Sequence, residues 1–295
     1  MAIHGTGYRR LEYRPTSLLR RMWAISALEY KSLFRRRLGV MVFIACLAPA
    51  LFNLVIVCIQ MGLFQFSMPE GDVQVVVSRL DPKSIDFYLT SVVGEFPSFL
   101  VFLVLTSLVS CRAIAKDRES SALEIYWTRG ITPRDYFVAK WLGSFLLLGT
   151  VFVGGPLLNW LLGVAFAPDE EFFAVTSVFV PRVLLGLVIF TAGLTFVAVL
   201  FSAIAGTANL ASILWLFLLL GTAAVGRVLA RVFGGEWWFK AIDPWDALKR
   251  VAEWVSGYVP RQNYDPMLAL LSVSAVILVL LFLAARRLRG EEAIG

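Results

Sequence analysis

Long apolar runs without charged residues set the class of fold for this chain. Residues 38–61, for example, contain no Asp, Glu, Lys or Arg. About 20 apolar residues suffice for a helix to cross the hydrocarbon core of a bilayer, and the absence of water there requires every spanning segment to be a helix or part of a closed barrel. The runs are continuous rather than alternating, and 59% of all residues are hydrophobic. The sequence therefore predicts an all-α polytopic membrane protein.

Six of these runs are predicted to be transmembrane helices. They comprise residues 38–61, 96–111, 141–166, 183–205, 210–225 and 267–285. Only residues 206–209 separate the fourth run from the fifth, which predicts a tight helical hairpin. The outer segment at 62–95 includes the sequence VQVVV at 73–77, which is either a short strand or a packed loop.

The distribution of Lys and Arg predicts the orientation, because cytoplasmic segments carry an excess of these residues. Of the 27 Lys and Arg residues, 18 lie before the first span, between the second and third spans, or in the C-terminal tail. Both termini and the opening segment are therefore predicted to be cytoplasmic. The net charge of +6 follows from this bias and from contact with anionic membrane lipids, so it does not indicate a nucleic-acid partner.

Residues 17–37 have the pattern of an amphipathic helix at the inner membrane surface. At 100° per residue, one face gathers apolar side chains while Arg and Lys point away from it. That face comprises Leu19, Met22, Trp23, Ser26, Tyr30, Leu33 and Phe34. Ile25 and Leu28 fall outside the face, which suggests that a partner surface covers that side.

A second amphipathic pattern, DPWDALKRVAEWVSG at 243–257, lies between the fifth and sixth spans. Asp243 suits the N-cap of a helix and Pro244 its first turn. The apolar face comprises Trp245, Leu248, Ala252 and Val255, and the charged face comprises Lys249, Arg250 and Glu253. The pattern predicts an outer interfacial helix, and an ordinary aromatic belt without a role in transport fits it equally well.

The sequence contains no motif that would build a catalytic, metal or nucleotide site. The three cysteines, Cys46, Cys58 and Cys111, lie in or beside apolar runs without a Cys-x-x-Cys pair, and the one histidine, His4, lies in a polar tail. A disulfide framework, a zinc site or a Ser-His-Asp arrangement is therefore not expected. The glycines at 221 and 226 have the spacing of a phosphate-binding loop without its Lys and Ser/Thr. We predict that the chain is not an enzyme and holds no metal or cofactor.

The interiors of the predicted spans carry almost no ionisable groups. Carriers driven by ion gradients place such groups in the membrane, where each marks a pathway. A gradient-driven carrier is therefore disfavoured, and the driving energy is expected to come from another protein. Asn53 and Asn159 are the candidate residues of a substrate path, although hydrogen bonding between helices explains them as well.

Residues 116–135, KDRESSALEIYWTRGITPRD, form a long charged interruption between the second and third spans. The pattern predicts a short helix over 119–127, with Asp117 as its cap and a break at Gly130. Thr132 is expected to cap the third spanning helix, with Pro133 at its first position and Asp135 completing a capping box.

Three consecutive apolar residues stand within that charged segment. Ile125, Tyr126 and Trp127 are flanked by charge, as is typical of the centre of a protein interface. A partner-docking surface is favoured over a plain connecting loop, which would need fewer residues.

The same segment resembles the signature of ABC-2-type permeases, the membrane subunits of ATP-binding cassette exporters. Residues 118–124, RESSALE, and 136–140, YFVAK, follow the pattern found in this family between its second and third spans. Residues 28–37, LEYKSLFRRR, resemble the family's segment before the first span. Ser121 and Ala122 stand where Gly and Thr are common, and Pro133 is displaced from the position of a frequent proline.

The resemblance implies a cytoplasmic coupling helix that docks in a groove of a separate ABC ATPase subunit. Carried over by position, its docking residues are Arg118, Glu119, Leu123, Glu124 and Trp127. The N-terminal amphipathic helix would pack beside the coupling helix, and its residues of interest are Glu29 and Arg35. ATP and Mg would be bound by the partner ATPase alone.

The implied organisation is a cytoplasmic tail at 1–16, an amphipathic helix at 17–37 and a six-span ABC-2-type domain at 38–295. The implied function is the permease of an ATP-driven exporter in a bacterial inner membrane, paired with a second permease copy or a paralogue. The apolar spans favour a lipidic or amphipathic substrate. A membrane anchor or scaffold subunit that transports nothing is the alternative.

Overall fold

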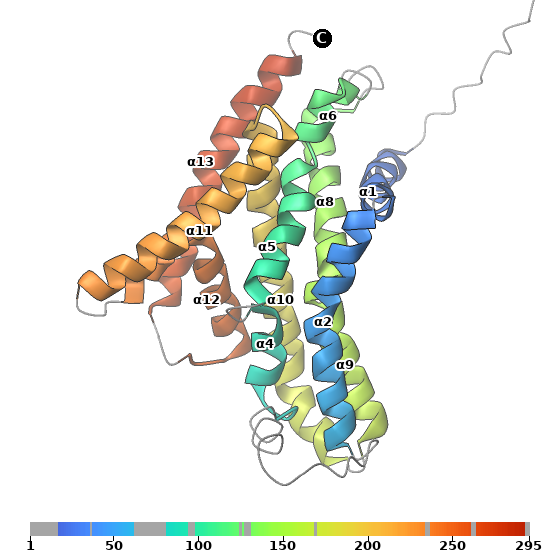
Figure 1. Ribbon diagram of the computed structural model, residues 1–295, viewed down its shortest axis with the longest axis vertical. Coiled ribbons are helices and arrows are strands. Elements are labelled where there is room, and N and C mark those ends of the chain that lie inside the picture. The colour runs from blue at the N-terminus through green and yellow to red at the C-terminus, as the bar shows by residue number, and fades with distance from the viewer. Residues whose placement is uncertain are drawn as a thin grey trace, which may run out of the picture.

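The structure is a computed structural model that describes residues 17–35, 37–61, 81–93, 98–123, 126, 131–167, 170–233, 237–260 and 264–292. Every regular element within these ranges is a helix (Figure 1), so the predicted helical class is confirmed for them. The elements are α1 (Leu18–Phe34), α2 (Arg37–Gln60), α4 (Ile85–Val93), α5 (Ser98–Leu108), η1 (Ser110–Arg112), α6 (Ala115–Glu119), α8 (Pro133–Phe152), α9 (Gly154–Phe166), α10 (Glu171–Ile204), α11 (Ala208–Val232), η2 (Trp237–Ile242), α12 (Pro244–Ser256) and α13 (Pro266–Glu292). The tail at 1–16 and the VQVVV stretch lie outside the described residues.

Five helical units in the described ranges are long and apolar enough to cross a membrane. They are Arg37–Gln60, Pro133–Phe166, Glu171–Ile204, Ala208–Val232 and Pro266–Arg287. These units identify a multi-pass helical membrane protein and correspond to five of the six predicted spans. The remaining run, 96–111, coincides with α5 and η1. The 11 residues of α5 rise about 16 Å, short of the roughly 30 Å hydrocarbon core, so a sixth span stays a prediction.

Several of the long helices, α8, α10, α11 and α13, extend beyond their predicted bounds. The helix α10 begins at Glu171 rather than at 183, and α11 continues to Val232 rather than ending at 225. Hydropathy marks the part of a helix that matches the bilayer interior, whereas backbone hydrogen bonding continues through the polar residues at its ends. The predicted short connection between α10 and α11 is confirmed, with Thr207 capping α11 through the amide of Leu210.

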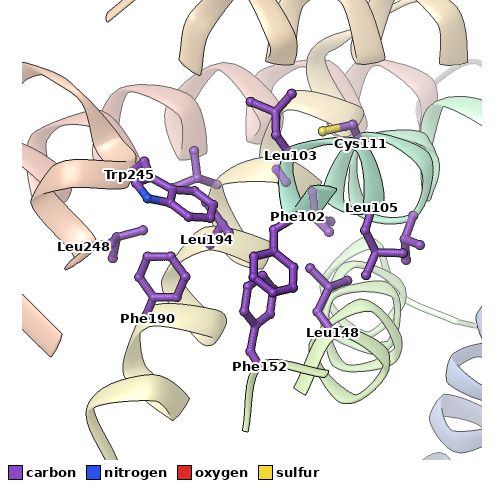
Figure 2. Close-up of a cluster of buried hydrophobic side chains, with 14 of the residues drawn as sticks. Phe102, Leu103, Leu105, Cys111, Leu148, Phe152, Phe190, Leu194, Trp245 and Leu248 are labelled. Carbon is purple, nitrogen blue, oxygen red and sulfur yellow. The ribbon is translucent and has the colours of Figure 1, made fainter. Parts of the chain in front are cut away.

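The helix α10 forms the centre of the bundle, and aromatic side chains join it to its neighbours (Figure 2). Phe152 of α8 lies between Phe102 of α5 and Phe190 of α10, with ring centroids 4.4 and 5.8 Å away. Phe190 in turn meets Trp245 of α12 edge to face at 5.0 Å. Edge-to-face contacts add to the burial of these large rings, so four helices share one aromatic core.

The helix α12, predicted to lie at or dip into the outer interface, is packed into the bundle, and its position relative to the membrane stays a prediction. Asp243 caps it and Pro244 begins it as expected, but nine of its 13 residues are buried, including the charged Arg250 and Glu253. Glycines of α10 permit this close packing: a Cβ on Gly186 would lie 2.6 Å from the Ala252 carbonyl oxygen. Amphipathic spacing shows which face is apolar but not whether another helix covers the polar face.

Replacing Gly186 with Ala should destabilise the protein, because the added methyl group would push α12 away from α10. We expect the free energy of unfolding to fall by about 1–3 kcal/mol, seen as a lower thermal unfolding midpoint in detergent. Gly221→Ala is the matched control, since a Cβ at that position in α11 meets nothing within 4 Å and alanine favours a helix by about 0.5–1 kcal/mol. Equal unfolding midpoints for the two variants would contradict a tight contact between α10 and α12.

Candidate functional site

The short helix α6 is the candidate functional site, because its charged residues bond three other helices, α8, α10 and α11. It spans only Ala115–Glu119 and lies in the charged segment between the second and third predicted spans. Its last three residues, Asp117, Arg118 and Glu119, are all charged, and each bonds a different partner. We call these contacts the α6 junction.

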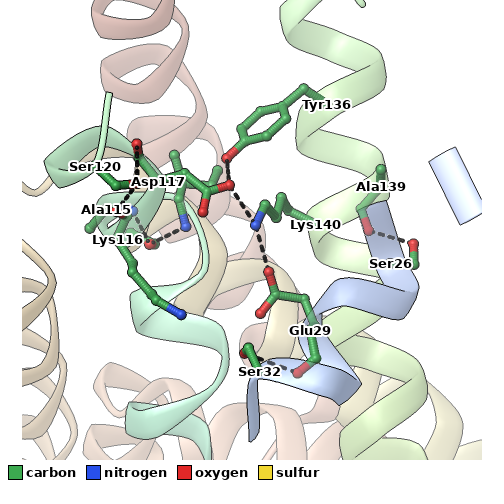
Figure 3. A network of polar contacts seen from close by, with 12 residues as sticks. Ser26, Glu29, Ser32, Ala115, Lys116, Asp117, Ser120, Tyr136, Ala139 and Lys140 are labelled. Atoms are coloured by element: carbon green, nitrogen blue, oxygen red, sulfur yellow. Dashed lines mark hydrogen bonds and ion pairs between the residues drawn. The ribbon is translucent and has the colours of Figure 1, made fainter. Parts of the chain in front are cut away.

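The first contact of the junction is a buried ion pair around Lys140 of α8 (Figure 3). The Lys140 ammonium lies 2.7 Å from an Asp117 carboxylate oxygen and 2.6 Å from a Glu29 carboxylate oxygen of α1. The phenol of Tyr136, one turn earlier in α8, donates a hydrogen bond to Asp117 at 2.8 Å. Lys140 is only 3% exposed, so one ammonium joins three helices away from water.

The ion pair is built where α1 and α8 approach closely. Ser26 of α1 donates a hydrogen bond to the Ala139 carbonyl at 2.7 Å. Gly143 allows this approach, since a Cβ there would lie 3.0 Å from the Ser26 backbone. Taking a charge out of water costs several kcal/mol, and close opposite charges with hydrogen bonds are needed to offset that cost. The two carboxylates supply them to Lys140.

The second contact holds the C-terminal end of α10. The Arg118 guanidinium donates to the carbonyls of Ala203, at 2.8 Å, and Ala205. Arg287 of α13 donates to the carbonyl between them, that of Ile204, at 2.5 Å. The last carbonyls of a helix lack partners within the helix and carry partial negative charge. Two guanidinium groups from distant parts of the chain therefore satisfy the end of the central helix.

The third contact holds the N-terminal end of α11. A Glu119 carboxylate oxygen accepts a hydrogen bond from the amide of Ala208 at 2.9 Å. The start of α6 is anchored in turn by Ser202 of α10, whose hydroxyl accepts from the amides of Ile114 and Ala115 at 2.9 and 3.0 Å. Negative charge is stabilising at a helix N-terminus. The junction thus ties α6 to both sides of the α10–α11 turn.

The structure corrects the cap predicted for this segment, whereas Ala122, Leu123 and Tyr126 within the predicted helix are helical. The sequence pattern predicts a helix over 119–127 with Asp117 as its cap. In the structure Asp117 lies within α6, and its carboxylate forms an ion pair with Lys140. The helix ends at Glu119, and Ser121 has a φ of 53°. In this left-handed region a side chain is strained and glycine is not.

The predicted docking residues divide into two groups. Arg118 and Glu119 bond the α10–α11 turn, and Leu123 is buried at 5% exposure, so these three contact their own chain. Glu124 and Trp127 lie outside the described residues. Their docking role stays a prediction for all five.

The other residues named from the sequence differ in their burial and in their contacts with the α6 junction. Glu29 belongs to the buried ion pair, and Arg35 is exposed at the end of α1. Tyr126, predicted to be an exposed aromatic, is half-buried and packs on Tyr136 with ring centroids 5.1 Å apart. Of the two residues outside the amphipathic face of α1, Ile25 is covered by this chain at 4% exposure, whereas Leu28 is 48% exposed, so a partner surface there stays a prediction.

The two asparagines of the proposed substrate path have different surroundings. Asn53 of α2 donates a hydrogen bond to the Phe87 carbonyl of α4 at 3.3 Å. That contact is the helix-to-helix bond that competed with a substrate role. Asn159 of α9 is 2% exposed, and its side-chain oxygen has no hydrogen-bond partner among the described residues.

Lys140 is the residue that the sequence analysis missed. It was counted with the cytoplasmic loop, but α8 begins at Pro133, capped by Thr132 as predicted, and Lys140 lies two turns into the helix. Tyr136, Lys140 and Gly143 recur at helical spacing, which places them on one face. That face, set against an acidic residue on α1, is the signal that could have revealed the pair.

A second buried polar cluster surrounds α12. Asp243, 2% exposed, accepts hydrogen bonds from the Thr222 hydroxyl of α11 at 3.0 Å and from the Trp245 amide. Burial, with Asp246 nearby, raises the pKa of Asp243 to about 7. Burial also raises the pKa of Glu253, whose carboxylate lies 3.7 Å from the Arg250 guanidinium. The cluster fixes α12 against α11.

No group of His, Cys, Asp and Glu suited to holding a metal ion occurs within the described ranges. Comparison with protein-family models and with curated proteins found no match to this chain. The site is therefore interpreted from its own geometry and from the resemblance noted in the sequence.

Removing the Lys140 ammonium should destabilise the protein strongly, because Lys140→Met leaves the buried carboxylate of Glu29 and the half-buried carboxylate of Asp117 without their cation. We expect a loss of about 3–5 kcal/mol in the free energy of unfolding. Lys83→Met is the control, since it breaks an exposed pair with Glu171 that should contribute less than about 1 kcal/mol. Adding Glu29→Gln and Asp117→Asn to Lys140→Met should recover most of the loss. If the single and triple variants are equally unstable, lost packing rather than unpaired charge is the cause.

The raised pKa of Asp243 predicts that stability falls as pH rises from about 4 to about 7. Over this range the folded carboxyl keeps its proton while the unfolded carboxyl, with an ordinary pKa near 4, loses it. Asp243→Asn should flatten this part of the profile, measured as the thermal unfolding midpoint in detergent at each pH. A profile with the same slope in Asp243→Asn would assign the effect to other groups, such as Glu253.

Proposed function

We propose that this chain is the membrane subunit of an ATP-driven exporter of the ABC-2 type, located in a bacterial inner membrane with both termini in the cytoplasm. The observation that carries the proposal is the α6 junction, in which one short helix is bonded to α8, α10 and α11 and, through Lys140, is linked to α1. Such an arrangement suits a helix that receives a mechanical input and passes it to several helices at once.

The contacts of the junction support this role because they leave α6 little freedom to move alone. Shifting α6 would separate Asp117 from a buried ammonium and remove Arg118 from the end of α10. Both contacts are charge-assisted hydrogen bonds, the strong class. A push on α6 is therefore relieved most easily by rigid-body movement of the attached helices, which is a common basis of switching in proteins.

The force on α6 is proposed to come from a cytoplasmic ABC ATPase that binds the segment following this helix. The sequence carries no nucleotide-binding motif of its own, so ATP and Mg would be bound by that partner. A second permease, identical or paralogous, would complete a central path, and its two halves would expose the path alternately to either side. The apolar spans favour a lipidic or amphipathic substrate.

Substitutions in the docking segment should uncouple this chain from its ATPase. Glu124→Arg and Trp127→Ala are expected to reduce co-purification with a co-expressed candidate ABC ATPase, and to reduce stimulated ATP hydrolysis, by at least about fivefold, the effect of losing about 1 kcal/mol at an interface hot spot. Both quantities are measured on the co-expressed complex in detergent.

Matched controls are Glu171→Arg and Trp254→Ala, which alter exposed residues elsewhere in the chain and should leave both quantities unchanged. A complex that forms but never shows substrate-stimulated hydrolysis would favour the scaffold role. A cysteine placed at Ser120, exposed at the end of α6, tests the side of the membrane. Labelling of that cysteine by an impermeant maleimide from outside intact cells would exclude docking to a cytoplasmic ATPase.

A further inference from the structure

A cavity of about 590 Å³ opens beside the α6 junction, between α1, the start of α2, and the segment from α5 to α6. Its polar walls carry five cations and two carboxylates. They are Lys31, Arg35, Arg112, Lys116 and Lys140, with Glu29 and Asp117. Lys140 is already bonded to both carboxylates. The other four cations therefore determine the charge that the cavity presents to a ligand.

These four cations have no counter-ion among the described residues. Lys31, Arg35, Arg112 and Lys116 make no ion pair and no side-chain hydrogen bond within those ranges, and the charges of the lining sum to +3. Lys31 and Arg35 are four residues apart on the α1 side, and Arg112 and Lys116 are four apart on the α6 side. Like charges held this close repel one another, and an anion between them would relieve the repulsion.

Most of the remaining lining residues are apolar. Leu28, Leu33, Leu38, Leu108 and Val109 contribute to the walls. The cavity also adjoins the start of the first candidate span, Arg37–Gln60, and the end of the short apolar helix Phe102–Arg112. A site with cations beside apolar walls, at the end of membrane helices, matches the boundary between lipid headgroups and acyl chains.

We propose that this cavity binds a phosphate-bearing anion, carried by an amphiphile whose apolar part lies against the leucine wall. A phosphate group presents several oxygen acceptors and up to two negative charges, and Arg and Lys are the residues that recognise it. Lys116 belongs to the cavity while its neighbour Asp117 belongs to the junction, so a bound anion would touch the helix that the junction holds. The binding proposal stands whether or not the chain is a transporter.

The test uses the purified full-length chain in a neutral detergent, without any ATPase. Binding of dioctanoyl phosphatidic acid, inorganic pyrophosphate and uncharged dioctanoylglycerol is measured by thermophoresis. We expect saturable binding of phosphatidic acid that weakens at least tenfold in Arg112→Gln with Lys116→Gln. The control, Arg20→Gln with Arg134→Gln, removes two exposed cations from outside the cavity and should change binding less than twofold. Arg112→Lys with Lys116→Arg should restore binding.

The three compounds distinguish a phosphate carried by a lipid from a phosphate in solution. Phosphatidic acid binding at least tenfold tighter than pyrophosphate supports a lipid or lipid-like ligand, whereas equal affinity with the same dependence on Arg112 and Lys116 supports a phosphate site filled from solution. Equal weakening in both variant pairs, equal binding of dioctanoylglycerol, or no saturable binding of either phosphate compound would overturn the proposal. Because no ATPase is present, these outcomes leave the proposed transport function untouched.

Discussion

The structure depends on one charge held out of water. Lys140 is nearly inaccessible to solvent and lies against the carboxylates of Glu29 and Asp117, so the positions of α1, α6 and α8 are set together. None of the three groups is well placed without the others, because a buried charge that loses its partner is far less stable than an exposed one. This requirement turns an amphipathic surface helix, a short connecting helix and a long membrane helix into one unit.

Four consecutive residues of α6 each contact a different part of the structure. Lys116 lines the cavity, Asp117 completes the buried ion pair, Arg118 bonds the last carbonyls of α10, and Glu119 bonds the first amide of α11. A helix of five residues cannot be stable by itself, so these bonds are what define it. The same bonds place the proposed anion site and the proposed docking segment on one small element, where a ligand and a partner would act on the same set of helices.

Much of the architecture could be predicted because it follows from local rules. Apolar runs placed five of the long helices, and capping residues placed the starts of α8 at Thr132 and α12 at Asp243. The candidate site was harder to predict from the sequence. The resemblance indicates Arg118 and Glu119 as residues that dock a partner and Glu29 as a residue of the entry helix, whereas in the structure all three bond their own chain. Lys140 was overlooked because a lysine near a loop is usually solvated, and only the contact with α1 removes it from water.

The sequence alone determined that this chain is a multi-pass helical membrane protein, because the cost of an unsatisfied backbone in lipid leaves few alternatives to apolar helices. It also determined where several helices begin, since caps act within a few residues. The tertiary structure decided which charged residues are buried, that α12 packs into the bundle instead of lying on its surface, and that α6 joins four other helices. These features depend on contacts between residues about 20 to 110 positions apart, such as Ser26 with Ala139 and Arg118 with Ala203, and no local pattern encodes which distant partner a side chain will meet.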